Sequence, residues 1–291
     1  MNSNTYKTAL KPLTSVVIWG GSFIATKFLL EYLEPLLIVL VRQILAVLFL
    51  TIIALKQKKS FAINLHDHTY IFILALIAAF HLWIQLNGLK HTTASNTGWI
   101  IGITPVFMTM LGIIFFKEKI TFTQLIGIFI SFVGLILLIS KGDISSIDFI
   151  SNKGDFLILA SSFTWSIYSF VNKKISVHYS ALMTILYLFL MMSIILLPFT
   201  INSKNIDSLF HLSMSGWYAL IFLGIFCSGL AYVLWAQAMS EMESSKVGAF
   251  LYIEPFVTVF TAWIFLKEEI TFLTMFSGII IIIGVILVNR K

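Results

Sequence analysis

The chain has 291 residues, of which 59% are hydrophobic and only 11% are charged. Soluble domains carry roughly 25% charged residues, so this composition excludes an ordinary soluble domain and favours a lipid bilayer. The net charge of +6 does not indicate a nucleic-acid partner, because the basic residues can be assigned to loops between apolar stretches. The single cysteine, Cys227, excludes a disulfide framework and a cysteine-ligated metal site.

Apolar stretches of the length that crosses a membrane, about 20 residues each, recur along the whole chain. We predict ten transmembrane helices, at 13–33, 36–55, 70–89, 94–116, 122–139, 155–172, 181–201, 216–239, 245–266 and 272–289. The first stretch is expected to stay in the mature protein, because no Ala-x-Ala site follows it and Lys27 lies inside it.

Basic residues are distributed unevenly between the two sets of loops. If the N-terminus is cytoplasmic, twelve Lys and Arg residues lie on the cytoplasmic side and five on the other, with Lys27 and Arg42 inside spans. By the positive-inside rule, we predict a multi-pass protein of the cytoplasmic (inner) membrane with both termini cytoplasmic.

Residues 91–140 and 241–290 share one pattern without a gap. The matched positions pair Gly98 with Gly248, Pro105 with Pro255, Lys117-Glu118 with Lys267-Glu268, and Gly134 with Gly284. Further upstream, the spacing from Trp19 to Lys27 is the same as that from Trp165 to Lys173. Self-similarity of this kind indicates an internal duplication, which in a membrane chain points first to a transporter.

The duplication predicts an inverted architecture. Five spans per copy is an odd number, so the second copy must cross the membrane in the opposite direction. We therefore expect an all-α protein of two inverted five-helix repeats, at 13–140 and 154–290, joined by a loop at 141–153. Inverted repeats can open a central site first to one side and then to the other, which is alternating access.

Polar residues at helical spacing indicate which spans line a cavity. The third span leaves two faces open, His81 with Gln85 or Trp83 with Asn87. The candidate cavity residues are Trp19, Ser22, His81, Trp83, Gln85, Trp165, Ser169, Tyr232, Trp235 and Glu254. The alternative role for the small polar residues is packing between helices, since Ser and Thr commonly hydrogen-bond within bundles.

Glu254 lies near the middle of the ninth span, where a charged side chain costs about 2.5–3.5 kcal/mol. Three roles remain open for it: binding a cationic or amino-bearing substrate, carrying a proton, or holding an intramembrane cation or the kinked backbone. Pro255 frees the carbonyl of Leu251 from its helical hydrogen bond, and Pro105 is its counterpart. We predict that both prolines kink their helices and take part in gating.

Two further charges lie within spans. Lys27 is near the outer end of its helix, so its side chain can extend outward, and Glu31 can pair with it. Arg42 has Glu31 and Glu34 nearby and can extend outward or join the first two helices. If either cation faces inward, it favours a carboxylate-bearing substrate, and with Glu254 it would hold the two ends of an amino acid.

Two similar runs follow the fourth and ninth spans. Thr121 has Gln124 three residues on, as in a capping box, and Glu118 lies near the start of the next helix, where negative charge is favoured. Glu268 and Thr271 repeat this arrangement in part. We predict helix capping for both runs.

Several motifs together resemble one known group of membrane proteins. They are Trp19-Gly20-Gly21-Ser22-Phe23, Pro105 and Glu254-Pro255, Glu118 with Thr121, and Glu268 with Thr271. In these motifs the chain resembles the drug/metabolite transporter superfamily, in its bacterial ten-helix members built from two EamA-type repeats. The resemblance covers nearly the whole chain. It implies secondary transport of small metabolites, often export of amino acids or amphipathic toxic compounds, from a cavity between the repeats.

We therefore predict a secondary transporter, an exporter of amino acids or related amphipathic compounds. The alternative within the same fold is a drug-efflux carrier. A channel is a rival from another class, as is an intramembrane enzyme using Ser22 with His81, although the second flanking glycine and the His-Glu-x-x-His motif of such enzymes are missing. No catalytic residue, metal or cofactor is expected. The expected partners are a small-molecule substrate and the bilayer, with a proton as candidate coupling ion, a homodimer as candidate assembly, and no nucleic acid.

Overall fold

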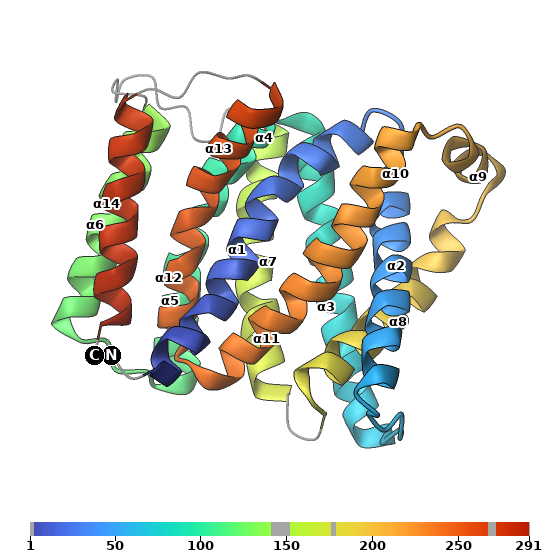
Figure 1. Ribbon diagram of the computed structural model, residues 1–291, viewed down its shortest axis with the longest axis horizontal. Coiled ribbons are helices and arrows are strands. Elements are labelled where there is room, and N and C mark those ends of the chain that lie inside the picture. The colour runs from blue at the N-terminus through green and yellow to red at the C-terminus, as the bar shows by residue number, and fades with distance from the viewer. Residues whose placement is uncertain (1–2, 141–151, 176–178, 267–271, 291) are drawn as a thin grey trace.

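The computed structural model describes residues 3–140, 152–175, 179–266 and 272–290. In that part of the chain every regular element is a helix (Figure 1). In chain order these are α1 (Ser3–Leu29), α2 (Pro35–Lys56), α3 (Leu65–His91), α4 (Ala94–Ile101), α5 (Thr104–Phe116), α6 (Phe122–Ser140), α7 (Lys153–Ile175), α8 (Ala181–Thr200), α9 (Ser203–Phe210), α10 (Met214–Ile221), the π-helix η2 (Phe222–Leu230), α11 (Ala231–Glu241), α12 (Ser244–Ala249), the 3₁₀-helix η3 (Phe250–Ile253), α13 (Glu254–Leu266) and α14 (Phe272–Asn289).

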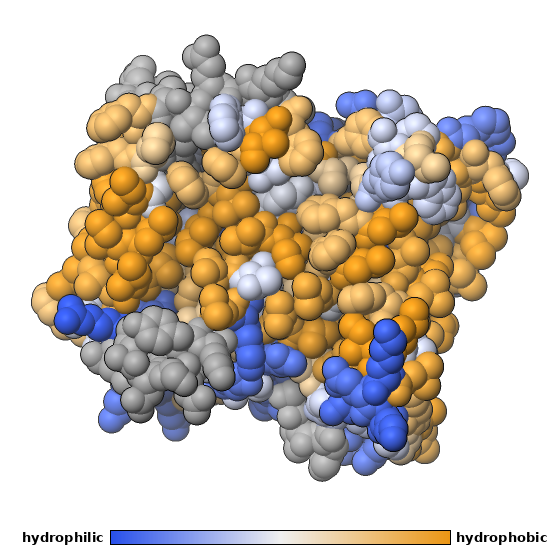
Figure 2. All heavy atoms as spheres, viewed as in Figure 1, coloured by the Kyte–Doolittle hydropathy of each residue, from blue (hydrophilic) through white to orange (hydrophobic). Residues whose placement is uncertain are grey.

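Most of these helices are apolar enough to cross a membrane. Seven helical stretches of at least 18 residues meet this standard, and α6 and α14 contain shorter apolar stretches, Phe122–Leu137 and Met275–Asn289. Hydrophobic side chains form a band across the middle of the molecule, and hydrophilic side chains lie mainly above and below it (Figure 2). The chain is therefore a multi-pass membrane protein, and the predicted all-α membrane fold is confirmed.

Each of the ten predicted spans has a helical counterpart. Seven spans are single helices: α1, α2, α3, α6, α7, α8 and α14. The span at 94–116 is divided into α4 and α5, the span at 216–239 into α10, η2 and α11, and the span at 245–266 into α12, η3 and α13. The short helix α9 was expected to be loop. Residues 141–151 of the predicted connecting loop, with Glu268 and Thr271, lie outside the described residues.

The first helices of the two repeats, α1 and α7, run in opposite directions. The Lys27 ammonium near the end of α1 and the Asp155 carboxylate near the start of α7 both hydrogen-bond to Thr92. At the other end of α1, Lys11 pairs with Glu241. We call the face that holds the start of α1 and the end of α14 the terminal face, and the face that holds Thr92 the distal face (Figure 1). This arrangement is the inversion that five spans per repeat require.

Local sequence explains where several helices begin. Pro35 takes the first position of α2, where its missing N–H costs nothing. The Asn64 side chain accepts a hydrogen bond from the His66 amide at the start of α3. At the start of α6 the Thr121 amide donates to Gln124 Oε1, and the Gln124 amide donates to Thr121 Oγ1. This reciprocal pair is the predicted capping box.

The two repeats are interleaved. The helices that pack most closely join one repeat to the other: α3 with α7, α2 with α8, α1 with α11, and α6 with α14. The last pair stands at one edge of the molecule (Figure 1), and its outer side chains, such as Phe129 and Ile283, are exposed. The core around the cavity is therefore built from both repeats.

Two broken helices cross near the centre. A turn at Gly102 and Ile103 separates α4 from α5, directly before Pro105, and the 3₁₀-helix η3 precedes Pro255 in the other repeat. The helices are antiparallel, so α4 packs against α13 while α5 packs against α12. Both prolines therefore stand at breaks, as expected for a residue that cannot complete the helical hydrogen-bond ladder. Their gating role stays a prediction.

Candidate functional site

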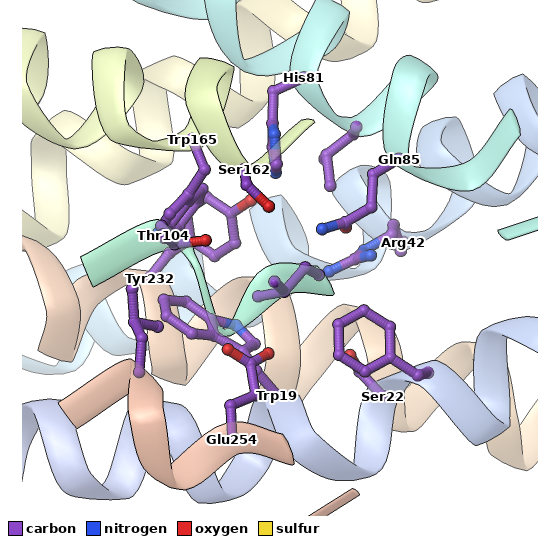
Figure 3. A pocket seen from close by; sticks show the side chains of 14 residues that line it. Trp19, Ser22, Arg42, His81, Gln85, Thr104, Ser162, Trp165, Tyr232 and Glu254 are labelled. Atoms are coloured by element: carbon purple, nitrogen blue, oxygen red, sulfur yellow. The ribbon is translucent and has the colours of Figure 1, made fainter. Parts of the chain in front are cut away.

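A cavity lies where the broken helices meet α1, α2, α3, α7 and α11 (Figure 3). Its volume, taken as the space that the centre of a water-sized sphere can reach, is about 50 Å³, whereas one water needs roughly 10–15 Å³. The cavity in this conformation therefore has room for a few waters. Of the candidate residues, the structure brings Trp19, Ser22, His81, Gln85, Trp165, Tyr232 and Glu254 to its wall.

Two opposite formal charges point into this cavity from different helices (Figure 3). Arg42 of α2 is only 4% exposed, and its Nε donates to Ser228 Oγ at 2.8 Å. Glu254 at the start of α13 is also 4% exposed, and no described side chain hydrogen-bonds to or pairs with its carboxylate. Of the alternatives left open for Arg42, the structure has the inward-facing one, because α2 is rotated so that Arg42 faces η2.

One face of α3 supplies neutral polar groups. His81 and Gln85 lie at the cavity, and His81 Nδ1 is 3.0 Å from the carbonyl oxygen of Ser161. A carbonyl can only accept, so Nδ1 carries the proton in this contact, and neutral His81 keeps Nε2 as an acceptor. Trp83 lies on the opposite face, 43% exposed and stacked on Phe80. The expectation that Trp83 lines the cavity is wrong, because α3 turns the His81 face inward.

An aromatic wall, formed by Trp19, Trp165 and Tyr232, closes one side of the cavity. The Trp19 ring centroid is 5.0 Å from that of Trp165 and 5.6 Å from that of Tyr232, both in edge-to-face geometry. Trp19 Nε1 donates to the carbonyl of Cys227 in η2 at 2.9 Å. This fixes the wall and satisfies the one polar atom of the indole.

Two candidate residues lie behind this wall and do not line the cavity. Trp235 is fully buried against Trp19 and Trp165. Its Nε1 donates to Ser169 Oγ at 3.0 Å. The pair supports the wall from α11 and α7, because the indole and the hydroxyl satisfy each other away from water.

Two polar residues that were not among the candidates, Thr104 and Ser162, also line the cavity. The Thr104 hydroxyl has no hydrogen-bond partner among the described residues. Its position in the repeat is that of Glu254, so the alignment of the repeats contained a signal for it. Ser162 follows Ser161, and only the rotation of α7 shows which of the two faces the cavity.

At the distal face, Lys27 closes the space between α1 and the end of α3. Its Nζ donates to the carbonyl oxygens of Leu89 at 2.8 Å and Thr92 at 2.6 Å. Helix C-terminal carbonyls favour a positive charge. Lys27 therefore reaches toward the distal face, where it binds the carbonyls at the end of α3 and where Glu31 is near enough to interact with it electrostatically.

At the terminal face, Glu118 binds the start of α12 in the other repeat. Its carboxylate accepts from the amides of Ser244 at 2.8 Å and Ser245 at 3.2 Å, and it pairs with Lys173 Nζ at 3.0 Å. Burial raises the pKa of Glu118, but the Ser244 amide, Lys173 and the Ser245 amide outweigh this and hold the pKa below its usual value. The capping role is as expected, but the helix is α12 and not the next one in the chain.

No cluster of three or more His, Cys, Asp or Glu residues that could hold a metal ion occurs among the described residues. The cavity instead offers an arginine donor, a carboxylate acceptor, amide and imidazole groups, and an aromatic surface. This set suits a small organic molecule that carries both a negative and a positive group.

Known proteins match this chain over its whole length. The model of the EamA-like transporter family matches residues 7–140 and 152–290. An uncharacterized transporter of Archaeoglobus fulgidus is 32% identical over 295 residues, covering 100% of this chain and 99% of that protein. The uncharacterized transporter YyaM of Bacillus subtilis is 26% identical over 274 residues, covering 93% of this chain and 89% of that protein.

A solved crystal structure shares the fold. It superposes with a TM-score of 0.74 at 14% sequence identity, covering 97% of this chain and 96% of that chain. At this identity the likeness shows the fold alone. The family model and the relatives agree with the broken helices, the duplication and the apolar band: the chain is a membrane transporter that belongs to the EamA-like transporter family of the drug/metabolite transporter superfamily.

Proposed function

We propose that this transporter carries a zwitterionic metabolite, an amino acid with an apolar or aromatic side chain, through the central cavity by alternating access. The observation that carries the proposal is the presence of Arg42 and Glu254 in one buried cavity. Glu254 has no partner among the described residues, so a substrate ammonium would offset the cost of its burial. The Arg42 guanidinium would bind the substrate carboxylate with paired hydrogen bonds.

The aromatic wall supports the side-chain preference. Trp19, Trp165 and Tyr232 present flat apolar surface beside the two charges. Aromatic side chains gain further stabilisation, about 0.5–1.5 kcal/mol per pair, when they pack edge to face. A substrate with an aromatic or branched apolar side chain would therefore bind better than a short polar one.

The size of the cavity supports alternating access over a pore. Room for a few waters is too little for an amino acid, so the helices around the cavity must separate before a substrate enters. Because the repeats are interleaved, the moving bodies must be groups of helices that draw members from both repeats. Broken helices at the membrane midplane are the usual place for such movement.

The proposal also includes the orientation of the protein in the membrane, the direction of transport and the coupling ion. The lysine-rich terminal face is cytoplasmic by the positive-inside rule, so both termini are cytoplasmic and the membrane is the cytoplasmic one. Export is the proposed direction. Glu254 faces the cavity and its carboxylate can take up a proton, which makes a proton the proposed coupling ion.

The test is counterflow in proteoliposomes. Vesicles preloaded with unlabelled amino acid should accumulate the labelled compound transiently, because a carrier exchanges substrate across the membrane while a channel only equilibrates it. A panel from glycine to tryptophan identifies the preferred side chain. Absence of counterflow for every amino acid would contradict the substrate class.

A drug-efflux carrier is the second candidate. Glu254 beside an aromatic wall suits a lipophilic cation, whereas Arg42 in the same cavity opposes it. Replacing Arg42 by Gln should improve the transport of such a cation and weaken that of an amino acid. Efflux of a fluorescent cation by the wild-type protein would favour this alternative.

A further inference from the structure

Lys27 and Lys173 occupy equivalent places in the two repeats, at opposite ends of the cavity. Each follows the first tryptophan of its repeat, Trp19 or Trp165, by eight residues. Both tryptophans line the cavity. Lys27 stands about one helical turn beyond Phe23, the last cavity residue of α1, toward the distal face, and Lys173 stands about two turns beyond Trp165 toward the terminal face.

The two ammonium groups bind equivalent backbone atoms. Lys27 Nζ donates to the carbonyl of Thr92 at 2.6 Å, and Lys173 Nζ donates to the carbonyl of Met242 at 3.0 Å. Thr92 and Met242 lie 150 positions apart, at the same point of the duplicated segments. The contact is thus one feature of the repeat, present once at each face.

Each contact holds the junction that leads into a broken helix. The α3–α4 junction continues into α4 and then to Thr104 at the cavity, and the α11–α12 junction continues through η3 to Glu254. A lysine that releases its junction frees the part of the broken helix next to that junction, α4 for Lys27 and α12 for Lys173. The part that begins at the proline, α5 or α13, keeps its own contacts.

At each face, a contact between the two repeats adds to the lysine contact. At the terminal face Glu118 crosses to the Ser244 amide and Lys173. At the distal face Asp155 crosses to Thr92 Oγ1 at 2.6 Å. Contacts of this kind are present at both faces at once in this conformation.

We propose that Lys27 and Lys173 are the two latches of the transport cycle, and that the carrier opens at the distal face when Lys27 releases the α3–α4 junction and at the terminal face when Lys173 releases the α11–α12 junction. The inference rests on the proposed alternating access. Both lysines lie near helix ends, where water can replace the carbonyl acceptors and solvate the released ammonium at low cost.

A single cysteine at the cavity reports which face is open. Cys227 is the only cysteine, so Cys227→Ser with Ser162→Cys gives one reactive thiol on the cavity wall. A membrane-impermeant methanethiosulfonate is added to either side of vesicles of known orientation, and the labelling rate is measured. Counterflow by this parent protein establishes that it still alternates.

We expect opposite changes in the two lysine variants. Lys27→Met should raise the labelling rate from the distal face severalfold and lower it from the terminal face, and Lys173→Met should do the reverse. Lys27→Arg and Lys173→Arg should keep the parent rates. Matched controls are the neighbouring exposed lysines, Lys90→Met and Lys174→Met, which should change neither rate.

Two results would overturn the proposal that Lys27 and Lys173 are latches. One is unchanged labelling in both Met variants. The other is faster labelling from both faces at once, in the Met variants and in the milder Lys27→Gln and Lys173→Gln, which means that the lysines only hold the fold together. If the wild-type protein itself shows no counterflow, the proposed carrier function fails instead, so the two failures are distinguished.

Discussion

At the scale of single residues, the position of each charge decides its role. Arg42 and Glu254 face the cavity, whereas Lys27, Lys173 and Glu118 bind backbone groups at its two ends. A buried charge is costly unless it is paired or hydrogen-bonded. Lys27, Lys173 and Glu118 meet this requirement within the chain. In the cavity, Arg42 meets it only in part, through Ser228, and water or substrate must supply the remaining partners.

Replacing the two cavity charges should change affinity for different parts of the substrate. Arg42→Gln and Glu254→Gln should each raise the KM for an amino acid roughly tenfold to a hundredfold, since a hydrogen bond to a charged group contributes about 1.5–3 kcal/mol. Arg42→Gln alone should leave the KM for the decarboxylated amine unchanged, because that analogue lacks the carboxylate. Glu254→Gln alone should leave the KM for the deaminated acid unchanged, because that analogue lacks the ammonium group. Initial rates in proteoliposomes measure this, with Lys174→Gln as control. Equal losses on all three compounds would contradict the assignment.

Glu118 makes the terminal closure sensitive to acid. Because its pKa is lowered in the folded protein, its contribution to stability is fully present above the ordinary glutamate pKa, about 4.3. That contribution is lost as the pH falls through the lowered pKa. Glu118→Gln should therefore lower the melting temperature at pH 7, and the difference from the wild type should disappear in acid. Thermal unfolding in detergent across this range measures it, and a difference that persists in acid would refute it.

At the scale of elements, breaks and close contacts shape the site. The turn before Pro105 and the 3₁₀-helix before Pro255 bring Thr104 and Glu254 to the same cavity. The π-helix η2 contributes Ser228, which binds Arg42, and the Cys227 carbonyl, which binds Trp19. Irregular helix segments of this kind are often found at functional sites, and here each one contacts a residue of the cavity wall.

The close packing of α6 against α14 depends on glycine. A Cβ at Gly284 would lie 2.6 Å from the Gly127 carbonyl oxygen and 2.6 Å from the Ser131 amide nitrogen. Gly284→Ala should therefore force the two helices apart and cost about 1–3 kcal/mol. A lower melting temperature in detergent is the expected result. Ile283→Leu, on the exposed side of the same helix, is the control, and equal stability of the two variants would contradict the prediction.

At the scale of the whole molecule, duplication and interleaving act together. Because the repeats are inverted, equivalent contacts occur once at each face of the molecule. Because the repeats are interleaved, every large helix of one repeat packs against a helix of the other. The equivalent contacts of Lys27 and Lys173 show how closely the repeats agree. The difference between Thr104 and Glu254 shows where they diverge, at the cavity.

The inverted arrangement predicts which loops share a side of the membrane. Ser60 follows α2 toward the terminal face, and Ser203 begins α9 at the distal face. Cysteines introduced at these exposed positions in a Cys227→Ser background should be labelled from opposite sides by an impermeant thiol reagent, with Ser60→Cys reached only from the cytoplasmic side. Labelling of both from one side would contradict the topology.

The sequence alone determined the membrane class, the ten spans, the duplication and its inversion. These follow from the length of apolar runs and from the order of residues along the chain, which do not depend on how the helices pack. It also pointed to Glu254, Trp19 and His81, because polar or bulky residues deep in a span are conspicuous among aliphatic ones. The capping box at Thr121 and Gln124 is local and was equally readable.

Only the tertiary structure decided which residues face the cavity and which residues pair with one another. Both depend on how each helix is rotated and on contacts between residues far apart in the sequence. The third span is apolar on most sides, so its sequence did not choose between His81 and Trp83. Arg42 turned inward because η2 lies beside α2, and Glu118 found its partner in α12, more than a hundred residues away. A linear pattern states which residues are unusual in a membrane; the packing of the interleaved repeats decides which of them meet.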